Sequence, residues 1–346
     1  MVDEARERPG VLIVSASMGG GHDGAARELA RRLEERGERP IVVDFLDAFP
    51  LAIGRLLRRV YRLQLGGASW SYDASYWLAA RVRIVYQPMV ILFALLTGRS
   101  LRRAIERERP SAVVSTYPFS SLVLGRGRLR GWLKVPLVTF VTDFAVHPLW
   151  AHKGADLHLC VHQSSARRAS MLSGGRAVAT GPMVPPRFAA RDVGKAEARE
   201  RLGLPRDRQL ALVVAGAWGL GDVTSTFDAL LRGGRYVPVA VCGTNDRLRR
   251  TLEERGQGVV LGWTDEMPLL MAACDVLVQN AGGLSCMEAF AAGLPVVTYR
   301  PVAGHGRHNG RDMALAGVAH LVVGDDQLLA TLDRATTLAG RGHVAA

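Results

Sequence analysis

The segment from Asp275 to Asn309, DVLVQNAGGLSCMEAFAAGLPVVTYRPVAGHGRHN, contains a complete strand, helix and strand pattern. Its first apolar run, residues 276–278, is short and uninterrupted, which is typical of a buried parallel strand. A helix should follow the glycine turn and end at Gly293, because Pro295 comes shortly after it. The second apolar run, residues 295–299, leads into a further loop. The notable members of that loop are Gly304, His305, Gly306, His308 and Asn309. The segment therefore predicts a βαβ unit with glycine-rich loops at the carboxyl ends of both strands.

The glycine turn of this segment lies where a helix should begin. The N–H groups of a first helical turn have no partner within the helix, and the helix dipole is positive there, so a diphosphate would fit beside Gly282 and Gly283. Glu288 can accept hydrogen bonds from the two hydroxyls of a ribose, as the acidic residue of dinucleotide-binding folds does. In the alternative interpretation the glycines only make a tight turn and Glu288 only favours the helix N-terminus. A single glycine pair is more often structural, so both interpretations stay open.

A second glycine-rich turn lies near the start of the chain. The apolar run Val11–Val14 predicts a strand, residues 24–36 predict an amphipathic helix, and Gly19-Gly20-Gly21-His22 lies between them. In a doubly wound fold the first such loop faces the ligand, and glycines let the backbone approach it closely. His22 is explained equally well as a capping residue and as a catalytic one. The spacing fits neither a dinucleotide fingerprint nor a Walker loop, since no Gly-Lys-Ser/Thr follows.

Polar residues also follow the predicted strand 135–141. Asp143 stands at its carboxyl end, and His147, Trp150 and His152 come soon after. A carboxylate with two histidines is compatible with a metal site, but neither a cysteine nor a further carboxylate completes a closed one. We therefore expect no metal ion at this position.

These motifs resemble those of the GT-B glycosyltransferases. The most similar group is the monogalactosyldiacylglycerol synthase and processive diacylglycerol glucosyltransferase family, a relative of the N-acetylglucosaminyltransferase that forms lipid II. The resemblance runs from Val11 to about residue 324 and is more specific in the second half. The matching positions are Gly19-Gly20-Gly21-His22, Thr142-Asp143, His147-Pro148, Trp150, Gly181-Pro182, Phe188, Asp275, Ala281-Gly282-Gly283, Glu288-Ala289, Gly293-Leu294-Pro295, Pro301, Gly304 and Asn309.

The chain departs from this family at two places. The family often has Ala-Gly-Pro-Gly-Thr where this chain has residues 281–285, and Pro-Gly-Gln-Glu where this chain has residues 303–306. The second difference falls where the sugar should lie. The resemblance therefore leaves the choice among glucose, galactose and N-acetylglucosamine open.

The resemblance implies roles for individual residues. His22 is expected to act as the general base on the acceptor hydroxyl, with Asp143 orienting the acceptor or the base. Further acceptor-side positions are Gly20, Gly21, His147 and Trp150. The expected donor-binding positions are Gly216, Gly219, Gly243, Asn245, Trp263, Thr264, Gly282, Gly283, Leu284, Ser285, Glu288, Gly304, His305 and Asn309. In such enzymes the backbone near Trp263 and Thr264 meets the uracil, while the acidic residue binds the ribose.

The expected architecture is α/β, with two doubly wound Rossmann-like domains facing across a cleft. Residues 1–185 should form the acceptor-binding domain and residues 194–346 the nucleotide-sugar domain. The proline-rich stretch 183–195 should link them. Beyond Asn309 the pattern predicts only a short strand at 321–323 and a helix at about 326–338.

A helical insertion is expected at about residues 51–97. Its first helix is basic and amphipathic, with Arg55, Arg58, Arg59 and Arg62 on one side, and Trp70 and Trp77 follow. Arginine mixed with tryptophan suits an anionic membrane surface. Alternatively, the insertion packs on its own domain and its arginines are merely solvated. The resemblance favours the membrane, because the family has its membrane-contacting segment here.

Composition bears on partners and compartment. The net charge of +12 over 346 residues indicates an acidic partner, although a GC-rich genome alone would favour so many arginines. The four cysteines are widely spaced and form no CxxC pair, which favours reduced thiols. We find no secretory signal and no apolar run near the roughly 20 residues that span a bilayer. We therefore expect a cytoplasmic protein bound peripherally to the inner face of the cell membrane.

The expected reaction is inverting transfer of a hexose from a UDP-sugar to a lipid hydroxyl, foremost that of diacylglycerol, without a cofactor. One alternative keeps the donor but uses a prenyl-linked glycan precursor or a secondary metabolite as the acceptor. Another is a GT-B-shaped epimerase, which would need further carboxylates. From a different class, the chain could be a non-catalytic basic protein with a degenerate site. A nucleic acid partner is not expected, because the aromatic residues lack the strand placement of an RNA-binding sheet.

Overall fold

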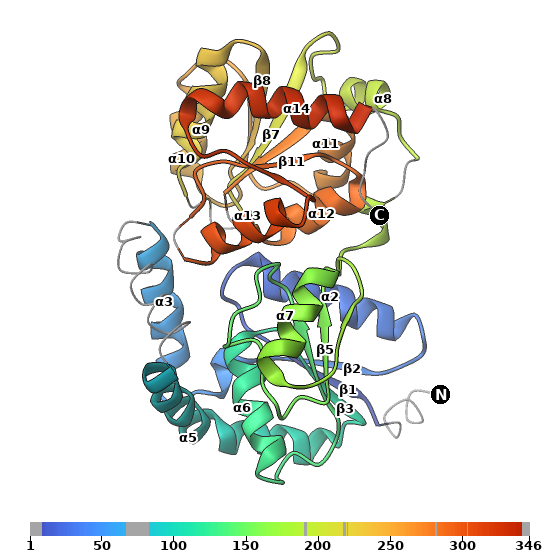
Figure 1. Ribbon diagram of the computed structural model, residues 1–346, viewed down its shortest axis with the longest axis vertical. Coiled ribbons are helices and arrows are strands. Elements are labelled where there is room, and N and C mark those ends of the chain that lie inside the picture. Colours follow the sequence, from blue (N-terminus) through green and yellow to red (C-terminus); the bar gives the residue numbers. More distant parts are fainter. Residues whose placement is uncertain are drawn as a thin grey trace. The chain divides into compact units, whose positions relative to one another are not determined.

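A computed structural model describes residues 9–66, 83–189, 192–216, 219, 221–280, 282–302 and 304–340 (Figure 1). The chain divides into two compact units with the boundary between Met183 and Val184. Unit 1 is the part up to Met183, and unit 2 is the remainder. Each unit contains one six-stranded parallel sheet flanked by helices. The α/β class with two doubly wound sheets, expected from the sequence, is therefore confirmed.

The sheet of unit 1 has the strand order β2-β1-β3-β4-β5-β6. The strands are β1 (Val11–Ser15), β2 (Pro40–Asp44), β3 (Ala112–Ser115), β4 (Leu137–Val141), β5 (Leu157–Cys160) and β6 (Ala177–Ala179). Their apolar runs form buried strands because helices cover the sheet and exclude water from it. The order reverses between β1 and β3, which lie side by side although β2 comes between them in sequence. In open parallel sheets ligands bind at such a reversal, beyond the carboxyl ends of the strands.

The helices of unit 1 are α2 (Gly20–Glu34), α3 (Ile53–Gly66), α5 (Arg83–Glu108), α6 (Pro118–Leu129) and α7 (Gln163–Ser173), with a 3₁₀ turn η1 (Phe45–Ala48). Helix α2 begins at Gly20, earlier than the expected Gly24. The glycines of the first turn and His22 therefore belong to the helix itself. Glycine is tolerated there because the first-turn N–H groups lack intrahelical acceptors in any case.

The sheet of unit 2 has the order β12-β11-β10-β7-β8-β9 and reverses between β7 and β10. Its strands are β7 (Gln209–Val214), β8 (Tyr236–Val241), β9 (Val259–Leu261), β10 (Val276–Gln279), β11 (Val296–Thr298) and β12 (His320–Leu321). Its helices are α8 (Lys195–Arg201), α9 (Val223–Gly233), α10 (Asp246–Glu253), α11 (Met267–Ala273), α12 (Leu284–Ala292), α13 (His305–Leu315) and α14 (Leu328–Gly340), with 3₁₀ turns η2 (Pro186–Phe188) and η3 (Asp325–Gln327). The βαβ unit predicted at 275–299 is confirmed as β10, α12 and β11, and Gly293 ends α12 in the left-handed conformation.

Helix α13 contradicts the sequence analysis, which predicted a loop through Asn309 and no helix before residue 321. The sequence did not predict this helix because it contains Gly306 and Gly310, and glycine is among the poorest helix formers. The structure explains Gly310 by packing. A Cβ atom at Gly310 would lie 2.7 Å from Cγ2 of Thr298 in β11, so only glycine lets α13 approach the strand. Close packing against the sheet thus compensates for the low helix propensity of this segment.

Candidate active site

His22 lies at the reversal of the unit 1 sheet. It stands in the first turn of α2, and its Nδ1 is 2.8 Å from the carbonyl oxygen of Thr116, just beyond β3. A carbonyl oxygen can only accept a hydrogen bond, so Nδ1 carries the proton and donates it. The lone pair is then on Nε2. In the neutral imidazole the contact therefore fixes the tautomer that a general base requires, with Nε2 as the acceptor.

The surroundings of His22 favour this neutral form. Burial lowers the pKa of the imidazole, while the charge of Asp143, the Thr116 contact and the charge of Asp23 oppose the shift. The ring meets the ring of Tyr117 edge-on at 5.1 Å between centroids and lies 5.8 Å from that of Trp150. An imidazole with a lowered pKa is neutral at pH 7, and the nearby carboxylate stabilises the cation once a proton arrives.

Asp143 is held in place by Trp150. The indole Nε1 donates to Asp143 Oδ2 at 2.8 Å, and Trp150 is completely buried. His147 Nε2 lies 3.9 Å from the same carboxylate oxygen. The Oγ1 of Thr142, the residue before Asp143, is 3.1 Å from His22 Nδ1. The positions that the sequence singled out in two separate motifs thus form one group with Thr116. We call this group the His22 cluster: His22, Thr116, Thr142, Asp143 and Trp150.

His152, the second histidine of the metal hypothesis, is engaged elsewhere. His152 Nδ1 accepts from the N–H of Gly154 at 3.0 Å, and the His152 N–H donates to His158 Nε2 at 3.3 Å. Within the described ranges, no group of three or more His, Cys, Asp and Glu side chains could hold a metal ion.

Two contacts of unit 1 were not foreseen from the sequence. The carbonyl of Thr116 fixes the His22 tautomer, and Ser15 Oγ donates to Asp23 Oδ1 at 2.7 Å beside it. Both Thr116 and Ser15 lie at carboxyl ends of neighbouring strands. Their positions at strand ends were the available signal, but a backbone acceptor has no signature in the sequence.

The first turn of α12 forms the centre of the candidate site in unit 2. Gly282 has φ of 74°, and its N–H donates to Gln279 Oε1 at 2.5 Å. A Cβ atom at Gly282 would lie 2.5 Å from Cβ of the buried Asn309. Glycine is therefore required at this position both by the positive φ and by the lack of space for a side chain. The N–H groups of Leu284 and Ser285 stand in the first turn, where a helix supplies no acceptor. The turn has the form of an anion site.

Gln279 is a residue that the sequence analysis missed. It is buried in β10, and besides holding Gly282 it donates from Nε2 to Thr298 Oγ1 in β11 at 2.6 Å. A polar residue ending an apolar strand was the available signal.

Glu288 lies in the second turn of α12 and is half-buried. Burial raises the pKa of its carboxyl group to about 7, and the positive charge of Arg187 partly offsets the shift. Within the described part of the chain, no hydrogen bond or ion pair engages this carboxylate. A buried carboxylate without such contacts would gain from donors supplied by a ligand.

Several other predicted donor-binding residues lie in loops after the strands, and two of them form hydrogen bonds with the loop backbone. Asn245 Nδ2 donates to the carbonyl of Gly219 at 3.0 Å, and its Oδ1 caps α10 through the N–H of Leu248. Thr264 Oγ1 accepts from the N–H of Glu266 ahead of α11. The Trp263 side chain is 63% exposed. Gly216 and Gly243 both have positive φ in turns after β7 and β8. All these loops lie at the carboxyl edge of one sheet.

The remaining donor positions follow β10 and β11. Gly283 occupies the N-cap position of α12, and Gly304 the same position of α13. His305 is the first residue of α13, and Asn309 lies completely buried beneath Gly282. The two helix N-termini are therefore adjacent.

The residues expected at the membrane differ in their exposure and contacts. Arg55 and Arg59 are exposed on α3, whereas Arg58 Nη2 pairs with Asp44 Oδ2 at 3.0 Å. Arg62 is exposed as well. Trp70 and Trp77 lie outside the described residues.

Known proteins resemble the chain in sequence. A family model described as monogalactosyldiacylglycerol (MGDG) synthase matches residues 22–183. The processive diacylglycerol beta-glucosyltransferase of Bacillus pumilus (strain SAFR-032) is 25% identical over 331 residues, which cover 92% of this chain and 84% of that protein. The protein of the same name from Bacillus mycoides (strain KBAB4) is 25% identical over 344 residues, covering 94% and 84%.

Solved structures resemble the chain in fold. Acinetobacter baumannii MurG has a TM-score of 0.60 at 15% identity, covering 97% of this chain and 95% of that one. The complex of TcCGT1 with UDP has a TM-score of 0.60 at 14% identity, covering 97% and 92%. At such identities the likeness establishes the fold alone. The chain is thus similar over nearly its whole length to processive diacylglycerol beta-glucosyltransferases, matches the monogalactosyldiacylglycerol synthase family model in unit 1, and has the two-domain GT-B fold of glycosyltransferases.

Proposed function

We propose that this protein transfers a hexose from a UDP-sugar to the free hydroxyl of diacylglycerol, with inversion at the anomeric carbon. The observation that carries the proposal is the neutral His22, whose Nδ1–H donates to Thr116 while Nε2 can accept a proton. The relatives named processive diacylglycerol beta-glucosyltransferase support the acceptor and the donor class.

In the proposed reaction His22 Nε2 removes the hydroxyl proton of the acceptor as its oxygen attacks the anomeric carbon. A C–O bond to the acceptor forms, the bond from the anomeric carbon to the diphosphate breaks, and UDP leaves with that electron pair. Attack from the side opposite the leaving group inverts the configuration. Asp143, oriented by Trp150, stabilises the imidazolium that results.

Unit 2 is proposed to bind the donor. The N–H groups of the first turn of α12 and its helix dipole would stabilise the charge that develops on the departing diphosphate. The Glu288 carboxylate would accept from the ribose hydroxyls, which supply the missing donors. This arrangement assigns the leaving-group charge to backbone dipoles, so the proposal invokes neither a metal ion nor a cofactor.

A lipid acceptor calls for contact with a bilayer, and unit 1 has a suitable surface. Helices α3 and α5 expose large apolar side chains, namely Leu56, Val60, Leu63, Ile91, Leu92 and Leu95. One face of α3 packs inward through Ile53 and Leu57, so packing on unit 1 and the proposed contact with a membrane would use different faces of this helix. None of the described helices is long and apolar enough to cross a bilayer. The exposed residues therefore favour contact with the membrane from one side.

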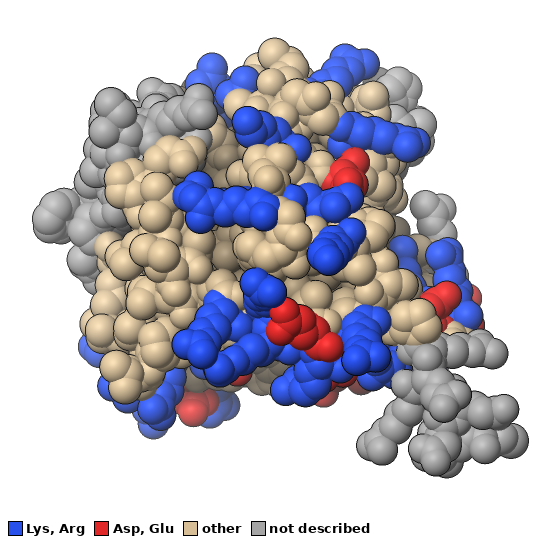
Figure 2. Space-filling view, turned by 90° about the horizontal axis from the view of Figure 1, so that it is seen from below, with Lys and Arg blue, Asp and Glu red and all other residues tan. Residues whose placement is uncertain are grey.

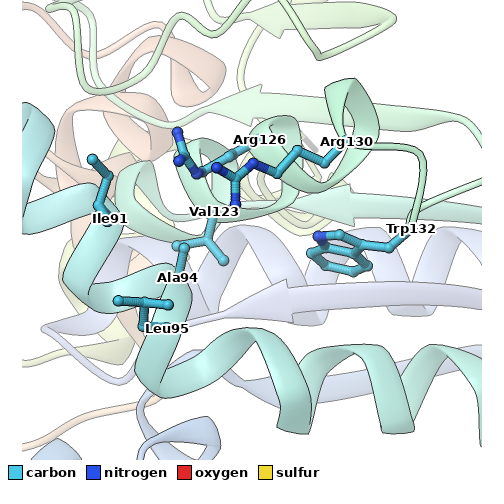
Figure 3. Close-up of a pocket in the computed structure, with 7 residues that line it drawn as sticks. All are labelled: Ile91, Ala94, Leu95, Val123, Arg126, Arg130 and Trp132. Atoms are coloured by element: carbon cyan, nitrogen blue, oxygen red, sulfur yellow. The ribbon is translucent and has the colours of Figure 1, made fainter.

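A basic hollow adjoins these helices. A hollow of about 200 Å³ lies between α5 and α6. Figure 3 shows the residues that line it, which are Ile91, Ala94, Leu95 and Val123 together with Trp132 and two arginines. The arginines, Arg126 and Arg130, have no carboxylate partner among the described residues, whereas Arg128 between them pairs with Asp156 at 3.0 Å. Figure 2, which views the end where α5 and α6 lie in Figure 1, shows many Lys and Arg side chains and few carboxylates. This charge pattern supports an anionic membrane surface as the partner.

The test is mass spectrometry of lipid products. Purified protein is incubated with UDP-glucose, UDP-galactose or UDP-N-acetylglucosamine on anionic liposomes that contain diacylglycerol, beside His22→Ala. A glycosylated diacylglycerol that disappears in the variant is the expected result, and it identifies the sugar. Binding of UDP without any lipid product would overturn the acceptor, and the absence of UDP binding would overturn the proposed activity as a whole.

A further inference from the structure

Asp23 is a carboxylate to which the proposed reaction assigns no role. It lies in the first turn of α2, directly after His22, and it is partly exposed. Its Oδ1 accepts a hydrogen bond from Ser15 Oγ at 2.7 Å. Ser15 is the last residue of β1 and is only 2% exposed. The bond therefore joins the helix that carries the proposed base to the buried end of a strand.

The start of α2 is rich in glycine and has no side-chain cap among the described residues. Three consecutive glycines, Gly19, Gly20 and Gly21, form it, and Gly19 at the N-cap position has φ of 108°. A Cβ atom added at Gly19 or Gly21 would have no described neighbour within 4 Å. Glycine loses more conformational entropy on ordering than any other residue. The first turn therefore depends on contacts that other side chains make with the sheet.

Both sides of the His22 contact are connected to the end of β1. Thr116, whose carbonyl oxygen lies 2.8 Å from His22 Nδ1, donates its own N–H to the Val14 carbonyl at 3.0 Å. Ser15 follows Val14 and donates to Asp23, the neighbour of His22. Two adjacent residues of one strand thus hold the acceptor and the helix that carries the donor. A hydrogen bond weakens steeply once its angle departs far from linear, so movement of the first turn would weaken the contact with Thr116.

We propose that Asp23, through its hydrogen bond to Ser15, is a positioning residue that holds the first turn of α2 and so orients His22. The inference rests on the proposed function, in which His22 is the general base. A misplacement of about 1 Å in a reacting group can lower a rate about 100-fold, so a small movement of this turn is measurable. In this role Asp23 neither takes the proton nor touches the substrate.

A purely structural role for Asp23 would have different consequences. A carboxylate near a helix N-terminus interacts favourably with the helix dipole, so its loss would lower the melting temperature and leave His22 unchanged. The positioning role predicts the reverse. Asp23 is partly exposed, so its carboxylate can turn to water once Ser15 no longer donates, and the cost in stability stays small.

The titration of His22 reports on this contact without any measurement of activity. Burial lowers the pKa of His22 and the charge of Asp23 opposes that shift, so loss of the charge should lower the pKa further. Asp143 also raises this pKa, and His147 Nε2 lies 3.9 Å from the Asp143 carboxylate. The Tyr117 ring faces His22 edge-on, and burial raises the pKa of its hydroxyl, so it stays neutral. These three residues are retained in every variant, which assigns a change in the titration to Asp23.

The experiment combines kinetics, calorimetry and NMR on the full chain. Steady-state kinetics use anionic liposomes that contain diacylglycerol, and NMR follows the histidine side chains, with the His22 signal identified by its absence in His22→Ala. Ser15→Ala removes the donor and Asp23→Ala the acceptor. We expect each to lower kcat about tenfold, with a lower His22 pKa and faster exchange of its Nδ1–H. The UDP dissociation constant should not change, and the melting temperature should change little.

Two further variants separate the hydrogen bond from the charge. Asp23→Asn keeps an oxygen that can accept from Ser15 but loses the charge, so kcat should lie between those of Asp23→Ala and the wild type. The Nδ1–H of His22 should remain protected in this variant while its pKa falls. Ser15→Ala with Asp23→Ala should be no slower than Asp23→Ala alone, because both substitutions break the same contact.

Ser173→Ala is the matched control. Ser173 is also a buried serine of unit 1, and its Oγ donates to the Ala169 carbonyl at 2.8 Å, but it lies at the end of α7. Its kcat and its His22 titration should equal those of the wild type. A loss in this control equal to that in Ser15→Ala would overturn the inference.

The remaining outcomes separate the inference from the proposed function. Wild-type kcat and an unchanged His22 signal in Ser15→Ala and Asp23→Ala would overturn the inference and leave the proposed function intact. A lower melting temperature with an unchanged His22 signal would assign Asp23 the structural role and would also overturn it. If the wild type forms no glycosylated lipid, the proposed function is wrong, and the His22 signal still decides whether Asp23 positions the ring.

Discussion

The candidate site of unit 1 consists of side chains, whereas that of unit 2 consists mainly of backbone N–H groups and glycine turns. In unit 1 the imidazole of His22 is oriented by a carbonyl and balanced by the carboxylate of Asp143. In unit 2 the first turn of α12 is shaped by Gly282 and the buried Asn309 beneath it. Proton transfer needs one group with a suitable pKa, while anion binding needs several dipoles pointing the same way. Substitutions should therefore affect the two sites through different measured quantities.

The largest effect should come from His22→Ala. Loss of the base is expected to lower kcat by about 10³-fold, because general base catalysis contributes on that order. The proposed donor site lies in unit 2, so the UDP dissociation constant should not change. Product formation and calorimetry on the same preparation measure the two quantities, and a weakened UDP affinity would contradict the division of roles.

Membrane attachment should depend on unit 1 and on the arginines without carboxylate partners. We expect Arg126→Gln with Arg130→Gln to weaken binding to anionic vesicles by roughly 30-fold, since each basic residue near such a surface contributes about 1 kcal/mol. Vesicle co-sedimentation at low and high salt measures it. Arg128→Gln is the control, because its guanidinium already pairs with Asp156. An equal loss in the control would indicate nonspecific charge instead of the hollow.

The backbone geometry of unit 2 can be tested by adding one methyl group. Gly282→Ala places a Cβ atom 2.5 Å from Cβ of Asn309 at a positive φ, so we expect UDP binding to weaken about tenfold. Gly283→Ala is the matched control, because the position has negative φ and nothing lies within 4 Å of its added Cβ atom. Equal effects of the two substitutions would show that the turn geometry does not matter.

Glu288 makes donor binding depend on pH. Burial raises the pKa of its carboxyl group to about 7, so the group is mostly protonated at pH 6 and mostly ionised at pH 8. The ionised form accepts from hydroxyls, so affinity should increase with pH. The increase from pH 6 to 8 is at most about tenfold, because the ionised fraction rises from about a tenth to nine tenths. Glu288→Gln controls for titration of UDP itself, and an identical pH profile in that variant would remove Glu288 from the donor site.

The smallest effect should come from Trp150→Phe. The substitution removes the indole N–H that donates to Asp143 but retains a large ring in the core. We expect kcat to fall about fivefold, which corresponds to the net value of about 1 kcal/mol of a typical protein hydrogen bond, with the donor KM unchanged. Steady-state kinetics with a melting curve measure it. A change in the donor KM alone would contradict the placement of Trp150 in the His22 cluster.

The regular elements could be predicted well because their signals are local. Buried parallel strands such as 11–15 and 276–279 are continuous apolar runs, and the end of α12 at Gly293 follows from a glycine with a proline shortly after it. Helix α13 could not be predicted in the same way. Its stability comes from packing on Thr298, which offsets the low propensity of Gly306 and Gly310. Propensity is local, whereas that packing depends on a strand earlier in the chain.

The same division applies to the candidate sites. The sequence alone was enough to propose the candidate residues His22, Asp143 and Glu288, because their motifs are short and contiguous. Only the tertiary structure decided which tautomer His22 adopts and which residue holds Gly282. Thr116 and Gln279 provide those answers from other strands. Parallel sheets bring the carboxyl ends of strands that are distant in sequence to one edge, and no local pattern records which of them become neighbours.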